Sequence, residues 1–99
     1  MKHLYAEFTA RLGAQQQVAG LVAAYADQVR GEKGCLAFDP FVRSEDERRW
    51  VVFEAYVDDA AFGAHMTTEH NRRFNAEIVQ HIEGGTPSLV WLTAVASRR

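Results

Sequence analysis

The chain has 99 residues, a formal net charge of −2 and a hydrophobic fraction of 47%, which is enough for one domain with a small core. We therefore expect residues 1–99 to form a single domain. The charge provides no basic field for nucleic acid. The sequence contains no run of about 18 apolar residues, the length that could span a membrane, so neither nucleic acid nor a membrane is an expected partner. The single cysteine, Cys35, excludes an intrachain disulfide. Without the apolar segment of a signal peptide, a cytoplasmic protein is the expectation.

The first predicted element is a half-buried strand over residues 3–10, in which polar and apolar positions alternate. Tyr5 and Glu7 belong to its more polar face. Residues 14–30 follow as an amphipathic helix that ends near the glycines at 31 and 34. The apolar stripe of this helix consists of Val18, Leu21, Val22, Tyr25 and Val29.

Two strands joined by a charged turn come next, over residues 35–42 and 50–57. Pro40 cannot donate to a ladder, so the first of them is expected at a sheet edge or with a bulge. The second strand has an apolar face made of Val51, Phe53, Ala55 and Val57. Its mixed face is made of Trp50, Val52, Glu54 and Tyr56. We expect the apolar face to pack against helices and the mixed face to point away from them, as the wall of a cavity.

A helix in two parts follows. An aspartate pair beginning at Asp58 provides an N-cap for the first part, and a threonine pair ending at Thr68 offers a second N-cap. We expect the second part to span residues 68–83, and the break lets His65 and His70 point toward a common space. The last strand is predicted over residues 89–96, and residues 97–99 are expected to form a frayed tail.

The resulting order, β-α-β-β-α-β, predicts an α+β, ferredoxin-like fold in which both helices cover one face of a four-stranded antiparallel sheet. The other face would expose a large patch. A second copy packed sheet against sheet would cover it, so we expect a homodimer with a binding cavity between the sheets. The side chains expected on this face are Tyr5, Glu7, Trp50, Glu54 and Tyr56.

Three stretches stand out together: Glu32-Lys33-Gly34-Cys35-Leu36, Phe53-Glu54-Ala55-Tyr56-Val57-Asp58 and Ala61-Phe62-Gly63-Ala64-His65-Met66-Thr67-Thr68-Glu69-His70. Over nearly the whole chain, the sequence resembles the antibiotic biosynthesis monooxygenase family. The resemblance implies a dimeric α+β barrel and a monooxygenase, an oxidoreductase that uses dioxygen with neither metal nor flavin. It implies a small aromatic substrate, a quinol or polycyclic phenol, in a cavity between sheet and helices.

The candidate catalytic residues are His65, His70 and Glu54. An ordinary imidazole, with a pKa near 6.5, can accept a phenolic proton at neutral pH and return it later. We expect His65 to be the base, with His70 as the second candidate and Glu54 as the orienting carboxylate. A structural role for His65 at the end of a helix is the alternative. The candidate substrate-binding residues are Tyr5, Glu7, Trp50, Tyr56, Asn71 and Phe74.

Other functions fit parts of the pattern. His65, His70 and Glu54 have the ligand types of a 2-His-1-carboxylate metal site, although no metal is expected. Some relatives degrade haem with an Asn on the first strand, but the first Asn here is Asn71. Others isomerise a small phosphorylated signal molecule, which would require cationic groups. The arginines considered for that role are Arg43, Arg72 and Arg73. A non-catalytic small-ligand-binding module on the same fold is a further alternative.

Overall fold

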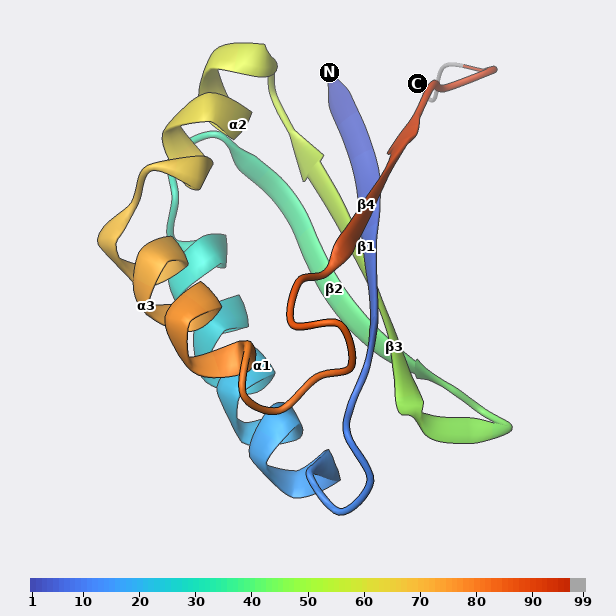
Figure 1. Ribbon diagram of the computed structural model, residues 1–99. Helices are drawn as coiled ribbons and strands as arrows, with labels where there is room; N and C mark the ends of the chain where they lie inside the picture. The colour runs from blue at the N-terminus through green and yellow to red at the C-terminus, as the bar shows by residue number, and fades with distance from the viewer. Residues whose placement is uncertain (97–99) are drawn as a thin grey trace.

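A computed structural model describes residues 1–96 of the chain. The elements are β1 (Lys2–Thr9), α1 (Gln15–Arg30), β2 (Cys35–Arg43), β3 (Asp46–Tyr56), α2 (Asp59–Met66), α3 (Glu69–Ile78) and β4 (Ser88–Leu92). The strands form one antiparallel sheet in the order β2-β3-β1-β4. All three helices lie on the same side of this sheet (Figure 1). The predicted α+β, ferredoxin-like fold is confirmed, with the second helix divided in two.

The helix boundaries follow from local hydrogen bonds. The side chain of Asp58 accepts a hydrogen bond from the amide of Ala61 and caps α2. The side chain of Thr68 accepts one from the amide of Asn71 and caps α3. The predicted break between the two helices is therefore confirmed. No helix within residues 1–96 is long and apolar enough to cross a membrane.

The orientation of β3 is opposite to the prediction. Glu54 pairs with Leu4, which is fully buried beneath the helices, and residues paired in register share a face of the sheet. Trp50 packs against the same core and stacks on Phe8, with ring centroids 6.0 Å apart. The mixed face of β3, including Tyr56, thus points toward the helices, and the prediction that it points away is wrong.

The opposite face of the sheet carries the apolar residues of β3 that were expected to pack against the helices. Val51 and Phe53 pair with Glu7 and Tyr5, respectively, and all four are only partly buried. The physical reason is that both faces of β3 are largely apolar, so a single carboxylate does not decide which face is covered. Glu54 is tolerated beneath the helices because the Tyr56 hydroxyl donates a hydrogen bond of 2.7 Å to it.

Two elements end earlier than predicted. Helix α3 ends at Ile78, but Ile82 remains fully buried and forms an isolated β-bridge with Ala10. Ile82 therefore belongs to the core as the spacing predicted, but it reaches the core through this bridge and not as part of a helix. The last strand, β4, ends at Leu92. Strand β2 lies at the sheet edge, as the position of Pro40 predicted. Its register shifts lie between Cys35 and Ala37 and between Val42 and Arg43, whereas Pro40 is in register with Val52. The expected tail at residues 97–99 lies outside the described residues.

Candidate active site

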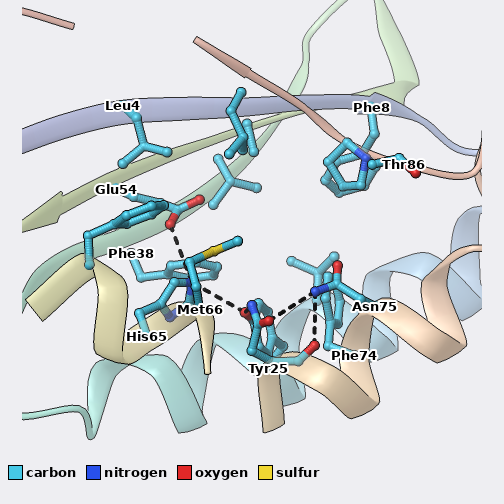
Figure 2. Close-up of a pocket in the computed structure, with 17 residues that line it drawn as sticks. Leu4, Phe8, Tyr25, Phe38, Glu54, His65, Met66, Phe74, Asn75 and Thr86 are labelled. Atoms are coloured by element: carbon cyan, nitrogen blue, oxygen red, sulfur yellow. Dashed lines mark hydrogen bonds and ion pairs between the residues drawn. The ribbon is translucent and has the colours of Figure 1, made fainter. Parts of the chain in front are cut away.

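A cavity of about 230 Å³ lies between the sheet and the three helices (Figure 2). Its walls are mainly apolar, and no Lys or Arg of residues 1–96 lines it. An apolar cavity of about 150 Å³ can hold benzene, so this one has room for a larger ring system. Aromatic side chains from both the sheet and the helices surround the space. They are Phe8, Tyr25, Phe38, Phe62 and Phe74.

Three polar residues that line the cavity are almost completely buried: His65 at 4% exposure, Glu54 at 5% and Asn71 at 8%. Figure 2 shows Glu54 reaching down from the sheet, with His65 and Tyr25 below it on the helices. The hydroxyl of Tyr25 lies 3.4 Å from Nε2 of His65 and accepts a hydrogen bond of 2.8 Å from Nδ2 of Asn71. Oε1 of Glu54 lies 3.8 Å from the same Nε2. One ring nitrogen of His65 thus faces a polar cluster in an apolar cavity.

The other ring nitrogen of His65 meets a carboxylate that sequence reasoning did not identify. Nδ1 lies 3.1 and 3.0 Å from the two oxygens of Glu32, which follows the end of α1. Nε2 of His70 donates to the same carboxylate at 2.6 Å. His65 and His70 therefore converge on Glu32, as the break between α2 and α3 allows. Of these three residues, only His65 lines the cavity.

Burial sets the protonation of the groups around His65. It raises the pKa of the Glu54 carboxyl above its ordinary value, against the opposing effects of the Tyr56 hydrogen bond and of His65. Burial also raises the pKa values of the Tyr25 and Tyr56 hydroxyls, so both phenols keep their protons at neutral pH. Glu54 consequently holds a proton to higher pH than a surface glutamate.

The structure brings together only some of the predicted site residues. Asn71 and Phe74 line the cavity with His65 and Glu54, and Tyr56 supports Glu54 through its hydroxyl. His70 reaches the site through Glu32.

Other predicted residues lie elsewhere. Glu7 and Trp50 line a separate polar hollow of about 380 Å³ at the other end of the sheet. Tyr5 lies on the uncovered sheet face, paired with Phe53. Strand alternation explains why Tyr5 and Glu7 lie away from the cavity, because they occupy the face of β1 opposite to Leu4.

Two residues of the cluster were missed. The sequence pattern places Tyr25 in the apolar stripe of its helix. The available signal for a polar role is that a buried tyrosine needs a partner for its hydroxyl. Glu32 gave no signal of its own, because its contacts are 33 and 38 residues distant. Within residues 1–96, no three His, Cys, Asp or Glu side chains are arranged to hold a metal ion.

Comparisons with known proteins agree with this architecture. One solved structure, described as an antibiotic biosynthesis monooxygenase, is 30% identical, has a TM-score of 0.89, and is matched over 97% of this chain and 100% of its own. A Pseudomonas aeruginosa protein is 27% identical, with a TM-score of 0.88 and coverage of 96% and 94%. A Mycobacterium tuberculosis protein at 20% identity, with a TM-score of 0.90 over 99% and 98%, shares the fold.

A search among curated proteins gave no match. The model of one protein family, however, matches residues 1–77, which is most of the chain. The match runs from β1 through α3 except for Ile78, the last residue of that helix. That family is described as antibiotic biosynthesis monooxygenase. The same span contains Glu32 and the three almost completely buried polar residues of the cavity, Glu54, His65 and Asn71. The chain therefore belongs to the antibiotic biosynthesis monooxygenase family.

Proposed function

We propose that this protein is a cofactor-independent monooxygenase that oxidises a small quinol or phenol with dioxygen in the cavity between the sheet and the helices. The observation that carries the proposal is the position of His65. Its Nε2 faces an aromatic-lined space beside Tyr25 and Glu54, while Nδ1 is hydrogen-bonded to Glu32. A buried imidazole with one nitrogen held and one facing a cavity can act as a general base.

The reaction can be written for a phenol whose para carbon carries hydrogen. One phenol and one dioxygen give one para-quinone and one water. The substrate loses four electrons, and dioxygen accepts them as it becomes the new carbonyl oxygen and the oxygen of water. No additional oxidant or reductant is required, so a shaped cavity with a proton-transfer group is sufficient in principle.

The proposed steps assign one task to the protein at each stage. Nε2 of His65 takes the phenolic proton, and the phenolate passes one electron to dioxygen. The two radicals combine at the para carbon, and the peroxide takes the proton from His65. The base then removes the hydrogen from that carbon while the O–O bond breaks, and the departing hydroxide becomes water with that proton. Glu32 and Glu54, on opposite sides of the ring, stabilise the imidazolium during the cycle.

The cavity itself favours an aromatic substrate. Its rings can pack against a planar ligand, and its apolar walls exclude water from the peroxide. A volume of about 230 Å³ lies below the common range for ligand pockets, so we favour a quinol or phenol of about two rings.

A phosphorylated substrate is less well supported by the geometry. No Lys or Arg among residues 1–96 lines the cavity, and Arg43 lines the separate polar hollow. Arg72 pairs with Glu69 on the exposed surface of α3. These positions favour the oxidation over the isomerase alternative, because a phosphate needs cationic or backbone donors close to it.

We also propose that the protein acts as a homodimer that covers the outer face of the sheet. Partly buried Tyr5, Val51 and Phe53 lie on this face, and Phe41 is exposed at the edge strand. An uncovered apolar sheet face of this kind is typical of an interface.

The test is oxygen uptake on a panel of quinols, naphthols and anthrones, followed by His65→Ala on any compound that is turned over. We expect kcat/KM to fall by roughly 10²-fold or more, since general base catalysis contributes that much. His81→Ala is the matched control, because His81 lies after α3 and outside the cavity lining. Full turnover by a folded His65→Ala variant, or loss of folding in it, would show that His65 is structural. Ligand binding without uptake on the whole panel would support the binding-module alternative.

A further inference from the structure

The two ring nitrogens of His65 face two different carboxylates. We propose that Glu32, held in place by His70, is the positioning residue that fixes the proton of neutral His65 on Nδ1 and leaves the lone pair of Nε2 directed at the cavity. This inference rests on the proposed role of His65 as the base. It changes the roles expected from sequence, because the orienting carboxylate becomes Glu32 and His70 acts through it rather than on the substrate.

The distances favour Glu32 over Glu54 as the proton acceptor. A neutral imidazole has one N–H, and an ionised carboxylate can only accept. Both oxygens of Glu32 lie within hydrogen-bond distance of Nδ1, at 3.1 and 3.0 Å. Oε1 of Glu54 is 3.8 Å from Nε2, which is beyond an N–H···O hydrogen bond, and it already accepts from Tyr56. The single proton is therefore best satisfied on Nδ1.

The hydroxyl of Tyr25 agrees with this tautomer. It already accepts a hydrogen bond from Nδ2 of Asn71 at 2.8 Å, so its own proton is available for another acceptor. Nε2 of His65 lies 3.4 Å away and can accept that proton only if it carries none itself. A substrate hydroxyl entering the cavity would replace Tyr25 as the donor to Nε2.

His70 fixes the carboxylate from its other side. Its Nε2–H lies 2.6 Å from Oε2 of Glu32, the oxygen that is also 3.0 Å from Nδ1 of His65. Glu32 is thus bound between two imidazoles that come from α2 and α3. A carboxylate held by two imidazoles loses little additional rotamer freedom when His65 becomes charged, which is the role of the third group in a catalytic triad.

Removing Glu32 should move the proton. In Glu32→Ala, Glu54 is the carboxylate that remains beside the His65 ring, on the side of Nε2. We expect the Nε2–H tautomer to become the major form, and in that form the nitrogen that faces the cavity cannot accept a proton. His70→Phe should shift the populations in the same direction but less, because Glu32 is still present without its second donor.

The experiment is ¹⁵N NMR of histidine-labelled protein at a pH where the imidazoles are neutral. The four His resonances can be assigned with single substitutions. We expect Nδ1–H as the major tautomer of His65 in the wild type, a reversal in Glu32→Ala, and no change in the control Glu77→Ala on the exposed side of α3. An Nε2–H tautomer in the wild type, or an unchanged tautomer in folded Glu32→Ala, would overturn the proposal.

This readout is independent of any substrate, so its failure can be distinguished from failure of the proposed oxidation. If Glu32→Ala does not fold, the wild-type tautomer and the shift in His70→Phe decide the question. With a verified substrate, kcat/KM of Glu32→Ala should fall by about 10²-fold or more, in parallel with the loss of Nδ1–H. Full turnover by a variant with the reversed tautomer would also refute the proposal.

Discussion

Gly34 is the position where one added methyl group should disturb the site most directly. A Cβ atom at Gly34 would lie 2.3 Å from Cβ of Ala61 on α2 and 3.4 Å from Cγ2 of Val57. The φ angle of Gly34 is not positive, so the constraint is steric rather than conformational. Ala61 precedes His65 by one helical turn, and Gly34 follows Glu32 by two residues. The absence of a side chain therefore lets the Glu32 loop approach α2.

The cost of Gly34→Ala can be worked from this contact. Ordinary contact between the two Cβ atoms begins at 3.4 Å, so α2 and the loop must separate by about 1 Å. Overpacking of this kind costs about 1–3 kcal/mol. For a domain of this size, each kcal/mol lowers Tm by about 4–8 °C, which gives a decrease of about 4–24 °C. The same movement would break the 3.0 Å contact between His65 and Glu32.

Thermal unfolding followed by circular dichroism tests this prediction, with Gly63→Ala as the matched control. Gly63 lies in the same helix, and a Cβ there meets no atom within 4 Å, so we expect Tm to stay or to rise. Adding Ala61→Gly to Gly34→Ala removes the clash and should restore the lost stability, less the roughly 0.5–1 kcal/mol that a glycine costs within a helix. A wild-type Tm in Gly34→Ala, or no recovery in the double variant, would refute the steric argument.

Three further predictions concern the buried polar groups and the assembly. Because burial raises the pKa of Glu54 in the folded state, its ionisation reduces stability as pH rises through that pKa; Glu54→Gln should therefore gain stability relative to the wild type at pH 8 and lose this gain toward pH 4, measured by urea unfolding. Tyr25→Phe leaves Nδ2 of Asn71 without its acceptor and should cost about 1–3 kcal/mol, whereas Tyr5→Phe on the outer face should cost less than about 0.5 kcal/mol. Sedimentation should show a dimer at micromolar concentration, and a species of only 11.1 kDa would contradict the proposed assembly.

The fold was largely predictable because its signals are local and repeated. The caps at Asp58 and Thr68, the glycine-terminated helix and the alternating strands each specify one element, and together they leave few arrangements. The faces of β3 were not predictable in the same way. Both sets of alternating residues are mostly apolar, and Glu54 pointed to the wrong one because a buried carboxylate is normally costly. Its partners Tyr56 and His65, which make burial tolerable, become visible only in the folded chain.

The candidate site was predictable in its residue types but not in its connections. His65, Glu54 and Asn71 were selected for their chemistry and do line one cavity. Glu32 was visible only as part of a motif, since nothing near it in sequence contacts its carboxylate. Contacts across 33 and 38 residues are set by how α1 and the segment that follows it pack against α2 and α3, and no local pattern encodes them.

The break between α2 and α3 is what makes the shared carboxylate possible. On one continuous helix, His65 and His70 would be separated by about 140° around the axis and could not both reach a single side chain. Helix α2 ends at Met66, and Thr68 caps the start of α3 in a new direction, so that Nδ1 of His65 and Nε2 of His70 lie 3.0 and 2.6 Å from the same oxygen of Glu32. Since the hydroxyl of Thr68 also donates to the carbonyl of His65 at 3.0 Å, one threonine both restarts the helix and holds the base that the second imidazole supports.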